Sequence, residues 1–328
     1  MEAIGRGGDG SAIPIADAKP PAWKKQQRNP CNMTDALVYV VILNWNGRDD
    51  TLACLASLAQ STYQPGRIVL VDQGSTDGTV EAVRRSFPAV EVVQTGGNTG
   101  FARGMNAGIR HALAAGATHV LLLNNDTIVA PAMLERLVVQ HAPDIGMIGP
   151  AIFYAGRPHQ IWSTGGGINP VLFEMTGNHG RGQSLPTRPA ERAFLSGCAM
   201  LIPRRVFEDV GLFDERFFMY YEDLDLCLRI GQAGYRLLLV PDAHLWHRVS
   251  QSSGGPNTPG ERYHTARSSG IFFRKHMHGW RIPLILLYRS LSALRWTVRL
   301  ARQDNAPALA AYWRGLRHGW LNREDLSS

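Results

Sequence analysis

Four short segments rich in apolar residues constrain the fold of this chain most strongly. They span residues 39–43, 68–71, 90–93 and 119–123. Their length and composition predict buried strands, and the apolar spacing of Leu52, Leu55 and Leu58 predicts a helix between the first two. Strands that alternate with helices predict an α/β fold with a mostly parallel central sheet flanked by helices, because parallel strands need crossover connections.

Polar residues follow these segments at the positions where the strands would end. They are Asn44, Trp45 and Asn46 after the first segment, Asp72 after the second, and Asn124, Asn125 and Asp126 after the fourth. Ligands bind at the carboxyl ends of the strands in an open parallel sheet, so the fourth strand would deliver the Asp126 carboxylate to a ligand site. The alternative interpretation is a plain polar turn in which Asp126 caps a helix.

Two common nucleotide-binding motifs do not occur in the sequence. The turn after the first strand, residues 44–47, lacks the GxGxxG pattern of dinucleotide-binding enzymes. There is also no GxxxxGKS or GxxxxGKT loop of a P-loop NTPase. A nucleotide would then bind by another geometry. A glycine-rich loop at residues 95–108 opens the next helix.

The second half of the chain loses the regular alternation of strands and helices. Residues 151–195 are rich in Gly, Pro and Arg, which predicts a long irregular binding loop or lid. A strand over residues 235–241 is followed by His244 and His247. Two histidines three residues apart, just after a predicted strand, are stronger candidates for ligands than a single histidine would be.

A cluster of acids marks the start of one helix in this half. The pattern of residues 222–229 predicts a helix whose first turn carries Glu222, Asp223 and Asp225. Acids at this end of a helix complement its dipole, which is one explanation for them. Three acids directly after an aromatic stretch exceed what the dipole needs, so the cluster is also a candidate catalytic site.

The composition of the chain indicates its cellular compartment and the kind of partner that it binds. The 328 residues carry a net charge of +7, and the pI is about 9.5, which favours anionic partners. Four cysteines without metal-ligand spacing predict reduced thiols in a cytoplasmic protein. Residues 1–36 predict a disordered tail without a signal peptide. No nucleic acid is expected as a partner, because the basic residues are dispersed and no recognition motif appears.

The C-terminal residues 276–328 predict an amphipathic helical extension. Within residues 282–300, Leu287, Leu291, Leu294 and Val298 form one apolar stripe, bordered by Arg295, Arg299 and Arg302. Arg289, Arg295 and Arg299 interrupt this segment, so it does not qualify as a transmembrane span. A stripe edged by arginine is typical of a helix that lies on a membrane surface. It is equally typical of a helix docked on the protein core, and the sequence leaves both interpretations open.

Taken together and in order, seven motifs resemble glycosyltransferase family 2, and in particular its rhamnosyltransferase-like branch. They occupy residues 41–46, 72–79, 98–108, 123–127, 196–200 and 221–229, together with His247 and the serines after it. The resemblance covers residues 38–275. It implies a GT-A type nucleotide-diphospho-sugar transferase fold over residues 37–275, with a nucleotide-binding half at 37–150 and an acceptor and catalytic half at 151–275.

The resemblance also implies an activity. It predicts inverting transfer of a sugar, with rhamnose or another deoxysugar favoured, from a dTDP- or UDP-linked donor. The acceptor would be a glycan or a lipid-linked glycan in cell-surface polysaccharide synthesis, at the inner face of the cytoplasmic membrane. Two alternatives stay open. One is a non-catalytic sugar-nucleotide-binding subunit of a glycan-assembly complex, and the other is a nucleotidyltransferase.

Site residues follow from the same resemblance. Asp223 matches the general base, with Glu222 as the alternative. Asp126 matches the last acid of the family's DXD motif, and with His247 it would bind a divalent metal, Mg²⁺ or Mn²⁺. Asn124 replaces the first acid of that motif, which leaves the dependence on metal open. The expected nucleotide-sugar-binding residues are Asn44, Trp45, Asn46, Asp72, Asn98, Arg103 and Asn125. Among these, Asp72 matches the acid that binds the pyrimidine, and Arg103 would add charge near the phosphates.

Overall fold

The computed structural model describes residues 36–177, 184–249 and 257–321. Its main sheet has ten strands: β1 (Val38–Asn44), β2 (Arg67–Asp72), β3 (Glu91–Gln94), β4 (His119–Asn124), β5 (Thr127–Val129), β6 (Ile145–Tyr154), β7 (Arg157–Ser163), β10 (Ala190–Arg192), β11 (Ala199–Pro203) and β12 (Arg236–His247). They run in the order β10-β12-β6-β11-β4-β1-β2-β3, with β5 beside β12 and β7 beside β6. A small separate sheet pairs β8 (Gly167–Ile168) with β9 (Met175–Thr176).

The central strands confirm the predicted α/β class. The pairs β1–β2, β1–β4, β2–β3 and β6–β12 are parallel. Strand β11 is antiparallel to both of its neighbours, β4 and β6. The strands β1, β2 and β4 therefore point the same way, and their carboxyl ends meet at one edge, as the sequence predicts.

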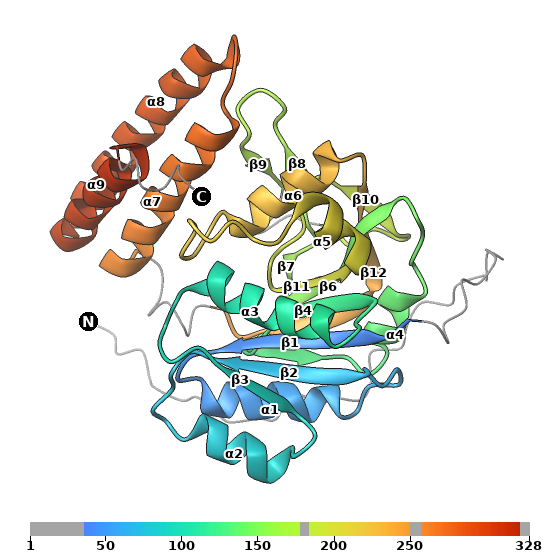
Figure 1. Ribbon diagram of the computed structural model, residues 1–328. Coiled ribbons are helices and arrows are strands. Elements are labelled where there is room, and N and C mark those ends of the chain that lie inside the picture. Colours follow the sequence, from blue (N-terminus) through green and yellow to red (C-terminus); the bar gives the residue numbers. More distant parts are fainter. Residues whose placement is uncertain (1–35, 178–183, 250–256, 322–328) are drawn as a thin grey trace.

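Helices cover both faces of this sheet (Figure 1). The helices that pack around the sheet are α1 (Arg48–Leu58), α2 (Thr79–Ser86), α3 (Phe101–Ala114), α4 (Met133–Val138), α5 (Arg204–Val210) and α6 (Glu222–Gln232). A C-terminal group follows, with α7 (Pro259–His276), α8 (Arg281–Arg302) and α9 (Ala306–Leu321). Successive residues of a strand point to opposite faces. In β1, Val41 packs toward α3, whereas Val40 and Ile42 pack toward α1. Burial of both faces explains why these strands are apolar almost throughout.

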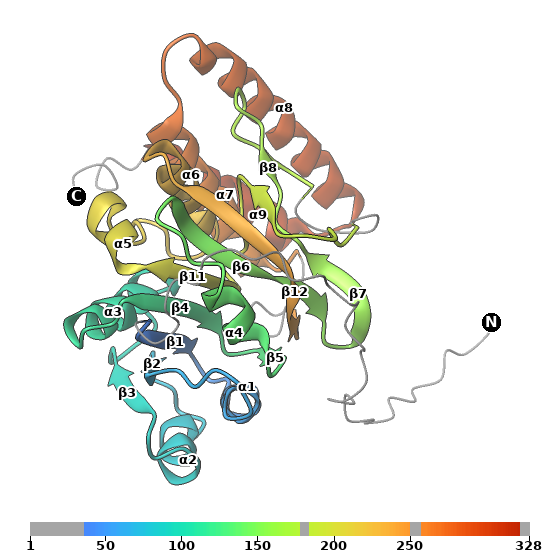
Figure 2. The same cartoon turned by 90° about the vertical axis from the view of Figure 1, so that its right-hand side faces the viewer.

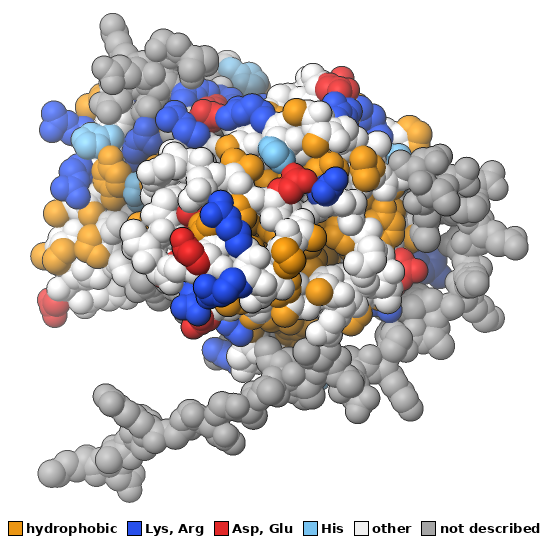
Figure 3. All heavy atoms as spheres, turned by 60° about the horizontal axis from the view of Figure 1, so that its bottom comes forward, with side chains coloured by type: hydrophobic (Ala, Val, Ile, Leu, Met, Phe, Trp, Pro, Cys, Tyr) orange, Lys and Arg blue, Asp and Glu red, His pale blue; other side chains and the backbone are white. Residues whose placement is uncertain are grey.

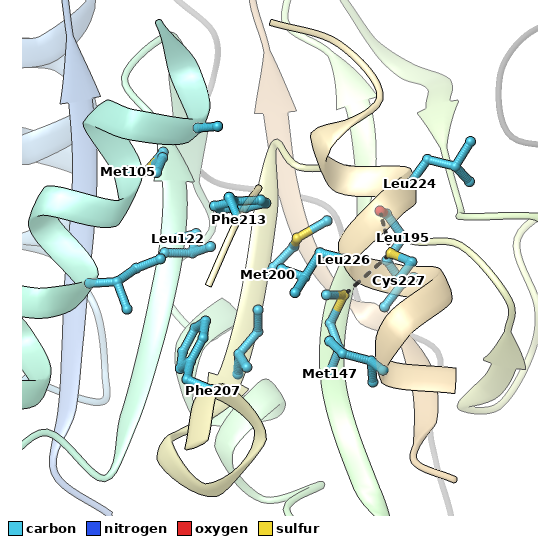
Figure 4. Close-up of a cluster of buried hydrophobic side chains, with 14 of the residues drawn as sticks. Met105, Leu122, Met147, Leu195, Met200, Phe207, Phe213, Leu224, Leu226 and Cys227 are labelled. Carbon is cyan, nitrogen blue, oxygen red and sulfur yellow. Dashed lines mark hydrogen bonds between the residues drawn. The ribbon is translucent and has the colours of Figure 1, made fainter. Parts of the chain in front are cut away.

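The core continues beneath α6, the helix that carries the acidic cluster (Figure 4). The Cys227 thiol lies 3.5 Å from the Leu195 carbonyl oxygen and 3.8 Å from the Met147 sulfur. Cys227, Cys54 and Cys198 are all free and buried; Cys31 lies outside the described residues. These contacts attach α6 to β6 and to the segment before β11, so the acidic end of α6 has a fixed position over the sheet.

The structure corrects the prediction of an irregular segment over residues 151–195. Strand β6 continues through Pro150 to Tyr154, and β7, β8, β9 and β10 follow. Pro150 pairs with Val240 next to a register shift in the β6–β12 ladder. A proline cannot donate to a ladder, and an irregularity of this kind is where a strand tolerates one. Gly and Pro therefore mark bends between short strands here.

Strand β12 is also longer than predicted. It runs from Arg236 to His247, so His244 and His247 lie within the strand and not after it. The register shift between Val240 and His244 absorbs Pro241, after which pairing with β6 resumes. A proline at this position predicts the end of a strand, but the bulge that accommodates Pro241 depends on the partner strand β6.

The C-terminal part consists of α7, α8 and α9. Helix α7 begins where Thr258 accepts a hydrogen bond from the Glu261 amide, followed by Pro259 in the first turn. Helices α7 and α9 cross closely because Gly315 faces the Tyr263 carbonyl, where an added Cβ would lie 2.3 Å from the oxygen. Figures 1 and 2 both show α8 as a long rod on the outside of this group.

Candidate active site

Asn44, at the end of β1, joins three turns at the carboxyl edge of the sheet. Its side-chain amide donates to Asp72 Oδ1 and to Ser75 Oγ, both at 2.9 Å. Its Oδ1 accepts from Thr51 Oγ1 at 2.9 Å and from Asn125 Nδ2 at 3.0 Å. The structure thus brings together Asn44, Asp72 and Asn125, three of the predicted nucleotide-binding residues, although they follow different strands.

Asp72 is fully buried in this network, whereas Trp45 and Asn46 are exposed. The second oxygen of Asp72 accepts the Ser75 amide at 3.0 Å. Asn46 adopts a left-handed backbone (φ 51°), and its Oδ1 accepts the Thr76 amide at 2.8 Å. In this structure Asp72 organises the turn, and a direct contact with a pyrimidine stays a prediction. Trp45 presents an exposed indole beside the turn.

Asn98 and Arg103 lie at the start of α3. The Asn98 side chain accepts the Gly100 amide at 3.0 Å and is exposed. Arg103 is exposed too, but its guanidinium forms an ion pair with Glu215 at 3.2 Å. Glu215 also pairs with Arg110 at 3.0 Å. The structure therefore directs Arg103 toward Glu215, and the role of Arg103 near phosphates stays a prediction.

Asp126 and His247 meet where β5 pairs with β12. Their register places His247 opposite Thr127, and His247 Nε2 lies 3.1 Å from Asp126 Oδ1. Both side chains are buried, and the ring of Trp162 packs edge-on against His247 at 4.6 Å. The interpretation of Asp126 as a helix cap was wrong, because strand β5 follows it and not a helix. The helix pattern lies further on, in α4.

The electrostatics of this pair favour an ionic contact. Burial alone would lower the pKa of His247, but its contacts with Cys198 and Asp126 outweigh burial and raise the pKa to about 10. Burial raises the pKa of the Cys198 thiol, and the neighbouring His247 opposes this rise.

The pair also fits the ligand chemistry of a divalent metal. Asp126 Oδ1 is buried without a well-oriented hydrogen-bond partner, as is His247 Nδ1. Once His247 has lost its proton, the carboxylate oxygen and the imidazole nitrogen, which lie 3.1 Å apart, can share one metal ion, with diphosphate oxygens as further ligands. Within the described ranges, no cluster of three or more His, Cys, Asp or Glu side chains forms a metal site. A metal at this position would therefore depend on the nucleotide for most of its ligands.

The second centre is the acidic end of α6. Asp223 Oδ2 accepts the Gly197 amide at 3.1 Å, and Asp223 Oδ1 accepts the Leu224 amide at 2.8 Å. Asp223 is partly exposed, whereas its neighbour Glu222 is buried with one oxygen unpaired. Tyr220 and Tyr221, which precede them, both have φ of 69°. Two consecutive left-handed tyrosines store backbone strain of a kind that clusters at functional sites.

Burial sets the protonation of the two carboxyls. It raises the pKa of Glu222 well above its usual value, and the neighbouring Asp223 charge adds to the rise. Burial also raises the pKa of Asp223, but the backbone N–H groups of Gly197, Leu224 and Asp223 itself oppose this rise. Only its own backbone N–H opposes the rise in the pKa of Glu222. Asp223 therefore loses its proton before Glu222 does.

Helix α7 supports this acidic turn with contacts that the sequence does not reveal. Asp225 is fully buried and binds Lys275 at 2.7 Å and His276 at 2.8 Å. Ser268 donates to the Met219 carbonyl at 2.8 Å, in the loop before the turn. The basic end of α7 looks like an ordinary complement to the helix dipole, so its function as an anchor for α6 was missed.

The loop before β11 lies between the two centres. Its Gly197 amide holds Asp223, and the next residue, Cys198, accepts the Asn124 amide through its carbonyl at 3.0 Å. The Cys198 side chain adjoins His247. Two consecutive residues thus connect the acid on α6 with the Asp126 and His247 pair.

Solved structures with a similar fold are sugar-nucleotide transferases. A mannosyltransferase from Pyrobaculum calidifontis, determined with GDP-mannose and Mn²⁺, has a TM-score of 0.54 and 19% identity; the match covers 93% of this chain and 81% of that one. GalNAc-T7, determined with UDP, GalNAc and Mn²⁺, has a TM-score of 0.57 and 19% identity over 75% of this chain and 48% of that chain. The fold is therefore of the GT-A type.

The chain belongs to glycosyltransferase-like family 2, whose model matches residues 35–262. It is 33% identical to an N-acetylglucosaminyl-diphospho-decaprenol L-rhamnosyltransferase of Mycobacterium tuberculosis over 288 residues, 80% of this chain and 92% of the relative. It is 24% identical to the dTDP-rhamnosyl transferase RfbF of Shigella flexneri, over 82% of this chain and 90% of the relative. The predicted enzyme class, an inverting glycosyltransferase, is thereby confirmed.

Proposed function

We propose that this enzyme transfers rhamnose or a related deoxysugar from a dTDP- or UDP-linked donor to a lipid-linked glycan, with Asp223 as the general base. The observation that carries the proposal is the position of the Asp223 carboxylate. Two backbone amides hold it, and the loop that supplies one of them also borders Asp126 and His247. The rhamnosyl donors and the decaprenol-linked acceptor named for the relatives support the choice of substrates.

The donor would bind along the edge formed by β1, β2 and β4. The exposed Trp45 indole and Asn46 would border the nucleoside, over the turn that Asn44, Asp72 and Asn125 organise. Asn98 and Arg103, at the start of α3, would line the same side. Asp126 and His247 would hold a divalent metal, Mg²⁺ or Mn²⁺, which neutralises the charge that develops on the leaving diphosphate. Solved GT-A relatives with Mn²⁺ support this assignment.

In the reaction, the acceptor hydroxyl attacks the anomeric carbon of the donor sugar. The glycosidic bond to the acceptor forms as the bond to the nucleoside diphosphate breaks, and the configuration inverts in this single displacement. Asp223 takes the proton of the attacking hydroxyl. Burial raises the pKa of Glu222 more strongly than that of Asp223, so Asp223 is the first of the two carboxyls to ionise. Glu222 is thus a positioning residue and the second choice for the base.

The lipid-linked acceptor would bring the enzyme to the inner face of the cytoplasmic membrane. No helix in the described parts of the chain is long and apolar enough to cross a membrane.

We assign residues 37–150 to the nucleotide-binding half, residues 151–275 to the acceptor and catalytic half, and residues 276–328 to a helical extension. The proposed tail, residues 1–36, lies almost entirely outside the described residues.

The test separates donor binding from transfer. Asp223→Asn should keep the affinity for dTDP or UDP within about threefold, and it should lower kcat by at least about 10³-fold, since the base is lost. Glu222→Gln keeps the shape of the neighbouring group, and we expect its loss to stay below about 10-fold. Glu81→Gln, on the exposed surface of α2, is the control.

Two outcomes would contradict the proposal. Transfer that survives in Asp223→Asn but not in Glu222→Gln would exchange the roles of the two acids. Nucleotide binding without turnover over a panel of lipid-linked and free glycans would instead favour the non-catalytic sugar-nucleotide-binding subunit, for which Asn124 at the first position of the metal motif is the supporting feature.

A further inference from the structure

The outer face of α8 carries an exposed apolar stripe. Its residues are between 40% and 60% exposed, and they are Leu284, Leu287, Leu291, Leu294 and Val298. The opposite side of α8 is anchored, since Ile285, Ala293 and Leu300 are buried. The stripe is therefore not used to dock α8 on the core, which was one of the two interpretations of its sequence pattern.

Positive charge borders this stripe on one side. Helix α8 contains no Asp or Glu, and Arg295, Arg299 and Arg302 lie beside the stripe. Arg295 and Arg302 are exposed and have no ion pair among the described residues. With Arg299 and Gln303, they line a shallow hollow of about 430 Å³ beside Val298. In the view of Figure 3, Lys and Arg side chains lie next to hydrophobic side chains at the left edge of the molecule.

The charge decides which partner the stripe fits. Its spacing of three and four residues is also that of a coiled-coil seam, so a second copy of the chain is the competing occupant. Pairing two copies of α8 would bring arginine against arginine, with no acid on either helix. An anionic lipid surface offers both an apolar layer for the leucines and phosphates for the arginines.

We propose that α8 docks on an anionic lipid bilayer, with its leucine stripe at the boundary of headgroups and acyl chains and with Arg295 and Arg302 on lipid phosphates. Trp280 begins this face and is 66% exposed, as suits a side chain that prefers the membrane interface. The inference rests on the proposed function in one respect: an enzyme that uses a lipid-linked acceptor has to reach the membrane surface.

The inner face of α8 connects the docking surface to the active site. Arg289 donates to Ser269 Oγ on α7 at 2.9 Å, and its guanidinium lies over the Phe273 ring at 4.7 Å. Arg289 also lies close to Tyr221, the residue directly before Glu222. Burial raises the pKa of Tyr221, and the charge of Arg289 opposes that rise. Because α7 also holds Asp225, the docked α8 would fix the height of the acidic turn above the bilayer.

The experiment measures binding of the full-length protein to vesicles by flotation. We expect binding to phosphatidylglycerol vesicles and little binding to phosphatidylcholine vesicles. Replacing Arg295 and Arg302 with Gln should lower the partition coefficient on the order of 30-fold, and it should weaken the salt dependence. Replacing Leu287, Leu291 and Leu294 with Gln should lower it by more than about 100-fold.

Matched controls use exposed residues on other elements. Arg84→Gln with Arg85→Gln on α2 removes the same charge, and Val139→Gln at the end of α4 removes a half-exposed apolar group. Both should keep vesicle binding. Equal binding to both lipids, or an α2 variant as weak as the α8 arginine variant, would overturn the proposal. A dimer in lipid-free solution that the leucine variant converts to a monomer would assign the stripe to a second copy.

The docking test is independent of the transferase test. The α8 variants should keep transfer to a water-soluble acceptor, and they should lose rate only on a lipid-linked acceptor in vesicles. Loss of nucleotide binding or of transfer in Asp223→Asn bears on the proposed function alone. Vesicle binding needs no donor, no metal and no turnover.

Discussion

The Asp225 carboxylate on α6 and the His276 imidazole at the end of α7 hydrogen-bond at 2.8 Å, although 51 residues separate them in the chain. Lys275 and Arg229 complete the shell of this fully buried acid, at 2.7 and 2.8 Å. The carboxylate therefore fixes α7 against the helix that carries the proposed base. Changes in this contact should affect both the stability and the geometry of the acidic turn.

Asp225→Asn should destabilise the protein by about 3 kcal/mol, because it leaves buried cationic partners without their counter-charge. The measurement is the free energy of unfolding in urea at pH 7. Glu81→Gln on the exposed surface of α2 is the matched control and should stay within about 0.5 kcal/mol. If Asp225→Asn lowers the free energy of unfolding by less than about 1 kcal/mol, the ion pairs and hydrogen bonds of Asp225 contribute little to stability.

Stability should fall in acid. Asp214 accepts from Arg216 and Lys275, and these partners outweigh burial and lower its pKa; His276, Arg229 and Lys275 do the same for Asp225. A carboxyl whose folded-state pKa is lowered stabilises the protein above its unfolded value, 3.8, and this contribution is lost as the pH falls below 3.8 toward the lowered folded-state pKa. Asp214→Asn should therefore flatten the dependence of the free energy of unfolding on pH below about pH 5. Parallel curves for the variant and the wild type would exclude Asp214 as a source.

Transfer should also depend on pH. Burial raises the pKa of Asp223 above its usual 3.8, and only its ionised form can accept a proton. The kcat/KM should therefore rise with pH through a value above 3.8 and then level off. The measurement is a pH profile over a range in which circular dichroism shows the protein folded. An acid limb at or below 3.8 would contradict the burial of this carboxylate or its function as base.

Metal binding can be measured without turnover. In the presence of UDP or dTDP, Asp126→Ala and His247→Ala should each weaken Mn²⁺ binding by at least about 10-fold, as followed by electron paramagnetic resonance. His244→Ala is the control, because His244 lies in the same strand, next to Phe153, and away from Asp126. Unchanged Mn²⁺ affinity in both site variants would move the metal elsewhere or exclude it.

Close packing of α7 and α9 gives a test of the C-terminal fold. Gly315→Ala places a Cβ 2.3 Å from the Tyr263 carbonyl oxygen, so the helices must separate, and we expect a loss of about 1–3 kcal/mol. Gly260→Ala, in the first turn of α7, adds a Cβ in open space. It should be neutral or stabilise by up to about 1 kcal/mol. The measurement is thermal unfolding of both variants. Equal stability of Gly315→Ala and Gly260→Ala would contradict the close crossing of α7 and α9.

The local sequence pattern was sufficient to predict the shared edge of the sheet and to single out the candidate acids. Alternating strands and helices predict the parallel centre, and a parallel centre brings the ends of β1, β2 and β4 to one edge. Asn44, Asp72 and Asn125 were found in this way, because their positions depend only on strand ends. The acidic turn at Glu222 and Asp223 was found because several acids follow an aromatic stretch.

Proline and glycine led to wrong predictions of strand ends and irregular segments wherever pairing with a partner strand determines the local structure. Pro150 and Pro241 lie inside β6 and β12 because the two strands shift their register at that point. The same shift keeps His247 in the strand, opposite Thr127. A pattern along one strand contains no information about such a bulge in its neighbour.

The sequence by itself determined the fold class, the shared edge and the chemical groups placed there, because these depend on local periodicity and on the strand ends. The family resemblance already paired Asp126 with His247, but only the tertiary structure decided that α7 holds Asp225 and that the leucine stripe of α8 faces outward. Each of these relations joins segments that are distant in the chain. They depend on which faces pack together, and an amphipathic helix has the same sequence pattern whether its apolar face is covered by protein or by lipid.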